Sequence, residues 1–274
     1  MSDSIDNLDP TAPASGGVDF TSAAYLEARR QAMIAAAEAT GFRGIDFDDP
    51  KSPAGHAYAI RKSTWLTSEF RRVHRKGAMD ITPQDVVDVL NEAGVKSWVL
   101  MGLHGYLGYM PEPRATQDVD VMVWHRERQK AKKAISARWP SLTIRSYSQV
   151  IRFGDPADLD TQGRPKQVID LMAPFAPFQE LIMKEYVVVD DKTKHRLPTV
   201  EAAIVSKYAA MVSAFRDRDK KEQDAVDFRR LVRANYDQLR REDLRRLAGL
   251  IWEGGAHEID QFVETAVTDA PFPI

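Results

Sequence analysis

The 274-residue sequence contains no cysteine, which excludes disulfides, thiolate metal ligands and cysteine nucleophiles. It also lacks any apolar run near the roughly 18 residues that a membrane-spanning helix requires. The N-terminus reads Met-Ser-Asp-Ser-Ile-Asp, without the basic start and apolar core of a signal peptide. Neither sign of charge dominates, with 38 Lys and Arg against 40 Asp and Glu, so nucleic-acid binding would have to come from local patches. We expect a cytoplasmic protein without membrane contact.

Four segments follow one another along the chain. Residues 1–19 are rich in Ser, Asp, Pro and Gly, which predicts a disordered tail. Apolar residues at helical spacing predict a helical N-terminal extension over 20–80. Residues 81–191 mix helix and strand patterns and form the expected α/β (α+β) core, and residues 192–274 read as a helical C-terminal module.

The expected elements can be placed by their periodicity and end signals. Thr82, Pro83 and Asp85 favour a helix start, and Gly94 favours its end. We expect helices over 21–40, 56–75, 83–93, 126–138, 178–184, 200–215, 224–234, 242–252 and 258–267. We expect strands over 96–102, 118–123, 142–153, 166–172 and 185–190, with a turn-rich connection over 155–164.

The most informative motif is Asp118-Val-Asp120-Val-Met-Val123. In a strand, Asp118 and Asp120 share one face, about 7 Å apart, while the valines fill the other. Asp170, in Val-Ile-Asp-Leu-Met, adds a third carboxylate if its strand lies alongside. Three converging carboxylates suit a hard divalent cation such as Mg²⁺, and hence nucleotide phosphates. The simpler alternative is that the pair serves solubility on an exposed strand face.

Glycines follow the strand that precedes this motif. Gly102, Gly105 and Gly108 would let the backbone approach a ligand, or open a helix whose amides bind phosphate. Close packing of a short helix on the sheet explains the same glycines. Their spacing matches neither a Walker loop nor a dinucleotide-binding fingerprint.

Together these motifs resemble the nucleotidyltransferase superfamily of the DNA polymerase β type, and in particular small prokaryotic members of the abortive-infection toxin class. The resemblance spans roughly residues 81–232. The matching stretches are Gly102-Leu-His-Gly105, Gly108, Arg114-Ala-Thr116-Gln-Asp118-Val-Asp120, Ile169-Asp170-Leu171, Lys207 and Asp224-Ala-Val-Asp227.

The resemblance implies a mixed sheet flanked by helices and an Mg²⁺-dependent transfer of a nucleoside monophosphate from an NTP, such as ATP, to a hydroxyl of RNA or protein. It implies that Asp118, Asp120 and Asp170 are catalytic and hold two Mg²⁺ ions, with Asp170 also acting as the base. The residues implied to contact the nucleotide, directly or by orienting its ligands, are Gly102, Leu103, Arg114, Thr116, Lys207, Asp224 and Asp227.

The chain departs from the family pattern at Leu103, which stands where a second Gly or Ser is usual. A catalytically impaired, nucleotide-binding or antitoxin-like partner protein of the same fold is therefore the alternative function. A cognate toxin or antitoxin is an expected partner in either case. An enzyme of unrelated chemistry, whose aspartates only line a surface, is a third reading.

Several charged residues keep two interpretations. Lys207 either contacts triphosphate or extends from a helix surface into solvent. Asp224 and Asp227 either orient Lys207 or contact the substrate, or they favour a helix dipole as acids of its first turn. The basic stretches 71–76 and 126–138 either contact an RNA backbone or form solvated faces.

Overall fold

The computed structural model describes residues 22–39, 53–190, 193–268 and 270–274, in two compact units that divide between Asp48 and Asp49. The first unit contributes the helix α1 (Ala23–Ala39). The tail predicted for 1–19 lies outside the described residues. None of the helices in the described ranges is both long and apolar enough to cross a bilayer.

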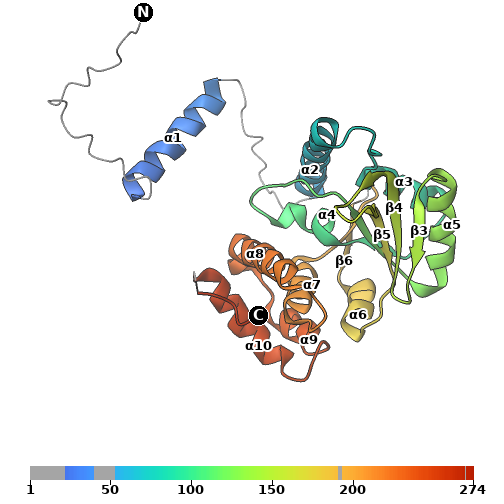
Figure 1. The fold of residues 1–274 in the computed structure, drawn as a ribbon. Helices are drawn as coiled ribbons and strands as arrows, with labels where there is room; N and C mark the ends of the chain where they lie inside the picture. Colours follow the sequence, from blue (N-terminus) through green and yellow to red (C-terminus); the bar gives the residue numbers. More distant parts are fainter. Residues whose placement is uncertain (1–21, 40–52, 191–192, 269) are drawn as a thin grey trace, which may run out of the picture. The chain divides into compact units, whose positions relative to one another are not determined.

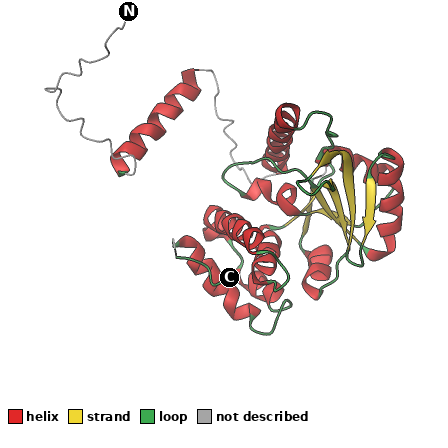
Figure 2. Ribbon diagram, in the orientation of Figure 1, coloured by secondary structure: helices red, strands yellow, loops and turns green. Residues whose placement is uncertain are grey.

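A five-stranded mixed sheet forms the centre of the second unit (Figures 1 and 2). Its order is β1-β2-β5-β4-β3, with β2 and β5 parallel and the other neighbours antiparallel. The strands are β1 (Trp98–Leu100), β2 (Val119–Val123), β3 (Thr143–Ser146), β4 (Val150–Leu159) and β5 (Pro165–Met172). The mixed α/β architecture expected from the sequence is confirmed.

The helix α4 packs on β1 and β2 of this sheet, and Figure 1 shows α5 on one side of the sheet and the helices α7–α10 beyond its other side. A smaller sheet pairs β6 (Val187–Val189) with β7 (Arg196–Pro198). The helices of the second unit are α2 (Pro53–His74), α3 (Pro83–Glu92), α4 (Gly102–Tyr106), α5 (Arg128–Arg138), α6 (Pro177–Glu185), α7 (Val200–Val212), α8 (Arg218–Asn235), α9 (Arg241–Ala248) and α10 (Gly255–Val267), with short 3₁₀ turns at Leu107–Tyr109, His125–Glu127 and Tyr236–Gln238.

Local signals fix α3 as the sequence predicts. The Thr82 side chain accepts the backbone N–H of Asp85, whose carboxylate accepts the backbone N–H of Thr82. This reciprocal capping box satisfies two otherwise unpaired donors of the first turn. Gly94 follows the helix with φ of +65°, a conformation that costs glycine little.

The chain departs from the expected elements in several places. The single strand expected over 142–153 is wrong, because the chain reverses over 147–149 and forms the two antiparallel strands β3 and β4. The strand expected over 96–102 is shorter, because Gly102 takes φ of +56° and begins α4. The turn predicted for 155–164 is wrong over its first half, since β4 continues to Leu159 and only the rest forms a hairpin turn. There the Asp160 carboxylate accepts the backbone N–H groups of Gln162 and Arg164. The strand β7 was not predicted.

Candidate active site

The acidic residues of the two strands lie side by side. In the parallel pairing of β2 with β5, Asp120 is opposite Asp170. Strands in a sheet are about 4.8 Å apart, and paired residues point to the same face. Val119 opposite Ile169 and Val121 opposite Leu171 are buried on the other face. The side-by-side placement expected of these two segments is confirmed.

Asp118 comes immediately before β2 and is partly buried. Its Oδ1 accepts a hydrogen bond of 3.1 Å from the hydroxyl of Thr116. Its charge raises the pKa of both Asp120 and Asp170, although the burial of each of those two groups raises it more. The three carboxylates therefore repel one another. They lie where β2 begins, on one face of the sheet, and we call Asp118, Asp120 and Asp170 together the acidic edge.

This repulsion is only partly offset. The pKa of Asp120 lies well above its ordinary value, because burial and the other two carboxylates outweigh the cations of Lys207 and Arg216. Burial raises the pKa of Asp170 to about 6, although the guanidinium of Arg152 acts in the opposite direction. Buried carboxylates that lie near other negative charges bind a cation or a proton favourably.

The first turn of α4 makes room for Asp120. A Cβ atom on Gly102 would collide with the carboxylate of Asp120, so only glycine fits there. Leu103, which departs from the family pattern, is buried in the core and borders the cleft. His104 is also buried, and its pKa is lowered to about 3, mainly by burial and then by Arg71 and His195. It lines a separate small cavity and is not placed to bind phosphate in the cleft.

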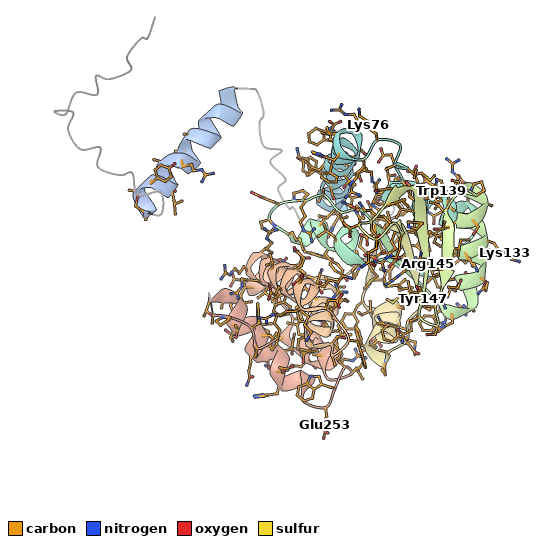
Figure 3. All side chains as sticks on the ribbon, in the orientation of Figure 1. Lys76, Lys133, Trp139, Arg145, Tyr147 and Glu253 are labelled. Atoms are coloured by element: carbon orange, nitrogen blue, oxygen red, sulfur yellow. The ribbon has the colours of Figure 1, made fainter. Side chains whose placement is uncertain are left out.

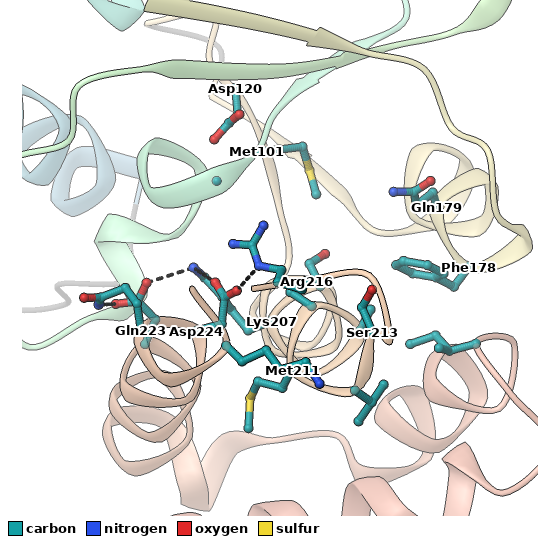
Figure 4. A pocket seen from close by; sticks show the side chains of 18 of the residues that line it. Met101, Asp120, Phe178, Gln179, Lys207, Met211, Ser213, Arg216, Gln223 and Asp224 are labelled. Carbon is teal, nitrogen blue, oxygen red and sulfur yellow. Dashed lines mark hydrogen bonds and ion pairs between the residues drawn. The ribbon is translucent and has the colours of Figure 1, made fainter. Parts of the chain in front are cut away.

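A cleft of about 1050 Å³ opens between the sheet and the helical module. Figure 4 shows Asp120 on the sheet side of this cleft and Lys207, Arg216 and Asp224 on the helical side. Of the ten site residues expected from the sequence, the described lining includes Gly102, Leu103, Arg114, Thr116, Asp118, Asp120, Lys207, Asp224 and Asp227. Asp170 borders Asp120 but does not belong to that lining.

Lys207 is held by two buried carboxylates. Its Nζ lies 2.9 Å from Oδ1 of Asp224 and 2.8 Å from Oδ2 of Asp227. Both aspartates lie in the interior of α8, which begins at Arg218, so the interpretation of them as acids of the first helical turn is wrong. Lys207 has a side chain only 12% exposed, which also excludes a solvent-directed role.

Two arginines complete this cluster. Arg114 donates to Asp227 over 3.0 Å, and Nε of Arg216 lies 2.6 Å from Asp224. Three cations therefore share two carboxylates, and we call these five residues the cationic wall. Its net charge is positive, and it faces the acidic edge of the sheet across the cleft.

The helix α2 supports the segment that precedes Asp118. Ser63, Thr67 and Arg71 are buried and share one face of α2, because they are spaced four residues apart. Their side chains donate to the carbonyls of Arg114, Thr116 and Gln117, over 2.5, 3.0 and 2.6 Å respectively. Thr67 also accepts the backbone N–H of Thr116.

Sequence reasoning missed these α2 residues, and it missed Arg152 and Arg216. Arg152 is opposite Asp170 in the antiparallel pairing of β4 with β5, with Nε 3.5 Å from Oδ2. Its position could have been found by aligning the two strands across their hairpin. Arg216 lies in the α7–α8 connection, where the sequence alone gives no signal.

The fit of a metal ion to this edge can be tested on the side chains. Within the described residues, no group of three or more His, Cys, Asp or Glu is arranged closely enough to hold an ion. The chemistry nevertheless suits one: Oδ1 of Asp170 is buried and finds no hydrogen-bond partner in the part of the chain that is described. Burial, and after it the neighbouring carboxylates, raises the pKa of Asp120, and burial raises that of Asp170, so a cation would stabilise both ionised carboxylates. The residues fit a divalent cation. On binding it, the carboxylate of Asp170 would break its ion pair with Arg152.

Comparisons with known proteins give distant structural similarity. No protein-family model matches the chain, and no curated protein does. An antigenic nucleotidyltransferase-like protein from Paracoccidioides brasiliensis aligns with a TM-score of 0.40 and 15% identity, over 68% of this chain and 94% of that one. A putative nucleotidyltransferase from H. pylori aligns with a TM-score of 0.40 and 17% identity, over 68% and 88%.

A third similar structure is terminal uridylyl transferase 4 from Trypanosoma brucei with bound GTP. It aligns with a TM-score of 0.24 and 15% identity, over 47% of this chain and 42% of that one. These scores do not assign the chain to a family. Its function has to follow from the residues of the cleft.

Proposed function

We propose that this protein is a nucleotidyltransferase that moves a nucleoside monophosphate from an NTP to a hydroxyl group. One observation carries the proposal: the parallel register of β2 and β5, which sets Asp120 beside Asp170 with Asp118 within electrostatic reach. The cationic wall across the cleft supplies the complementary charge for a polyphosphate.

Asp118, Asp120 and Asp170 would hold Mg²⁺, as two ions. Bound there, Mg²⁺ would neutralise charge that develops on the phosphates during transfer. The chain's own contribution is to bring three carboxylates to one face of the sheet. It does so through the β2–β5 register, through Gly102, which leaves room for Asp120, and through the hydroxyl of Thr116, which bonds Asp118.

The cationic wall would bind the triphosphate. Arg114, Lys207 and Arg216 offer charged donors, and the buried Asp224 and Asp227 hold them in fixed positions. Because two carboxylates share three cations, the wall keeps a net positive charge. This arrangement gives Asp224 and Asp227 an orienting role and leaves the direct contacts to the cations.

Asp170 would accept the proton of the acceptor hydroxyl. Its carboxylate lies beside Asp120 in the parallel register of β2 and β5, where the acceptor hydroxyl would meet it. The acceptor oxygen would then bond to the α-phosphorus, the bond from that phosphorus to the bridging oxygen would break, and pyrophosphate would leave. RNA or a protein side chain is the proposed acceptor, in a toxin-like role with a cognate partner.

A catalytically impaired nucleotide-binding protein is the second candidate. Leu103 is buried where the family pattern has a small residue, and Arg114 and Lys207 are already paired with carboxylates. These observations favour binding without transfer, and an antitoxin-like partner role would follow from it. The two candidates share the cleft and differ in turnover.

The test is to incubate the full chain with each labelled NTP, Mg²⁺, and total RNA or cell lysate. Label transfer by the wild type, lost in Asp118→Ala/Asp120→Ala and kept in the control Asp237→Ala, supports the enzyme. Asp237 is an exposed residue in a 3₁₀ turn of the helical module. NTP binding without transfer supports the second candidate. Equal transfer by the double variant and the wild type contradicts the assigned roles of the aspartates.

A further inference from the structure

A row of charged residues crosses four strands of the central sheet. Asp120 is paired with Asp170, Asp170 with Arg152, and Arg152 with Arg145. Residues paired across neighbouring strands point to the same face of a sheet. The row therefore runs from the candidate active site on β2 to the edge strand β3, and it changes from acidic to basic on the way.

The basic half of this row is accessible. Arg152 has a side chain 41% exposed, and Arg145 is exposed on the edge strand. Like charges directly opposite each other destabilise a strand pair. An anionic ligand that covers both guanidinium groups would remove that cost. Three strand spacings, or about 14 Å, separate Asp120 from Arg145 along the row.

An exposed aromatic residue adjoins the basic half. Tyr147 follows β3 with 51% of its surface exposed, and the guanidinium of Arg152 lies 5.5 Å from its ring centre. Arg128 donates to the carbonyls of Tyr147 and Ser148, over 3.1 and 2.8 Å, and so fixes this turn. An exposed aromatic ring on such a turn, beside a cation, is a surface on which a nucleic-acid base stacks.

The surrounding segment is strongly basic although the chain as a whole is not. Residues 121–154 contain eight Lys and Arg and a single acidic residue, Glu127. The carboxylate of Glu127 accepts hydrogen bonds from the backbone N–H groups of Lys96 and Ser97, so both of its oxygens already have partners. Figure 3 labels Arg145 and Tyr147 near the β3 edge and Lys133 on α5. Positive charge thus gathers around the β3 edge of the sheet.

In the other basic stretch, over 71–76, each arginine is paired with an acidic side chain. Arg71 is buried and bonds Asp80, Arg72 pairs with Glu69, and Arg75 pairs with Asp158. Unlike the row on the sheet, this stretch is not in register with the acidic edge. Of the two basic stretches, the one that includes α5 and continues to β3 and β4 is therefore the better candidate for binding an anionic ligand.

We propose that Arg145, Arg152 and Tyr147 bind single-stranded RNA and lead its terminal hydroxyl toward Asp170. The destination of that hydroxyl rests on the proposed function, whereas binding of the strand does not. Phosphates of the strand contact the two arginines, and one base stacks on Tyr147. The row selects RNA over a protein side chain as the acceptor.

Binding of a labelled single-stranded RNA to the full chain tests this surface, by fluorescence anisotropy in EDTA without NTP and at several salt concentrations. The RNA is longer than the roughly 4–16 nucleotides that such a site covers. We expect Arg145→Ala/Tyr147→Ala to weaken binding about tenfold or more and to flatten the salt dependence, because a phosphate contact and a stacking contact are both lost.

The matched control is Phe70→Ala/Arg72→Ala on α2, which also removes one arginine and one exposed aromatic ring. We expect the control to bind RNA as the wild type does, and both variants to unfold at the wild-type temperature. The proposal is overturned if the wild type does not bind at low salt, if both variants lose affinity equally, or if poly-glutamate of equal charge displaces the RNA as well as unlabelled RNA does.

The experiments distinguish failure of the RNA-binding proposal from failure of the nucleotidyltransferase proposal. Asp118→Ala/Asp120→Ala should bind RNA as tightly as the wild type, because neither residue belongs to the basic half of the row. If no NTP is transferred while Arg145→Ala/Tyr147→Ala still weakens RNA binding, the nucleotidyltransferase assignment fails and the RNA surface stands. If transfer to protein occurs without RNA binding, the enzyme stands and the RNA surface is wrong.

Discussion

At the scale of single residues, the carboxylate of Asp170 is held at an energetic cost. Its pKa is raised from 3.8 to about 6, so the ionised form is less favourable in the folded chain than in the unfolded one. Relative to high pH, protonation of Asp170 therefore adds to the free energy of unfolding. This contribution is fully present below about pH 4 and is lost as the pH rises through 6.

Asp170→Asn should accordingly stabilise the protein at high pH in EDTA. A shift of about two pKa units corresponds to about 3 kcal/mol at pH 8, and the gain should approach zero near pH 4. Arg152, which loses its partner, is partly exposed and remains solvated. Urea unfolding at several pH values measures the effect. Destabilisation by Asp170→Asn at pH 8 would show that the ionised carboxylate does not lower the stability of the folded chain.

Asp227→Asn should have the opposite effect. Asp227 is fully buried and accepts from both Arg114 and Lys207, so the variant leaves cations without their counter-charge. We expect a loss of about 3–5 kcal/mol in the free energy of unfolding. The exposed pair of Arg218 with Glu222 provides the control, and Glu222→Gln should cost less than about 1 kcal/mol. Equal losses in the two variants would mean that Asp227 is not a buried anchor.

Sequence reasoning reached the residues whose placement depends on local pattern. Strand alternation predicted one shared face for Asp118 and Asp120, but it left open whether the strand of Asp170 lies alongside. The same reasoning could not place Arg216, because its position depends on a loop conformation. It also missed Arg152, which an alignment of β4 with β5 would have placed opposite Asp170. It also left the role of Asp224 open, which required the bounds of α8.

At the scale of elements, α2 acts as a support for the segment 114–118. Thr67→Val keeps the side-chain shape but removes both bonds to the backbone of Thr116. We expect a loss of about 1–3 kcal/mol in stability, since buried polar groups are left unpaired. Because Asp118 follows this segment, affinity for divalent cations should fall as well.

The control for α2 is Ser68→Ala, which removes an exposed bond to Asp80 one residue along the helix. It should leave both stability and cation affinity near the wild-type values. Chemical unfolding and cation titration of the two variants check these expectations. A cation affinity unchanged in Thr67→Val would limit α2 to a purely structural role.

Elements differ in how far the sequence predicts them. The ends of α3 follow from Thr82, Pro83, Asp85 and Gly94, because caps and glycine conformations are local. By contrast, Asp155 and Pro156 suggest a turn, yet pairing with β5 continues β4 past both of them. The strand β7 spans only three residues and forms by pairing with β6, so periodicity could not reveal it.

At the scale of the whole molecule, the candidate site exists only because two parts of the second unit meet at the cleft. The sheet supplies the acidic edge, and α7, α8 and their connection supply Lys207, Arg216, Asp224 and Asp227. The sequence predicted both parts as separate segments. The cleft between them depends on tertiary packing, which no local pattern encodes.

The most direct test of this account is a titration of the full chain with Mn²⁺, as a paramagnetic stand-in for Mg²⁺, followed by electron paramagnetic resonance. If the three carboxylates share a cation, Asp120→Asn and Asp170→Asn each weaken binding at least about tenfold, since each removes a charged oxygen ligand. The exposed control Asp237→Asn should bind as the wild type does. Wild-type affinity in Asp170→Asn would show that the carboxylates of β2 and β5 do not share a cation, and would contradict the central claim.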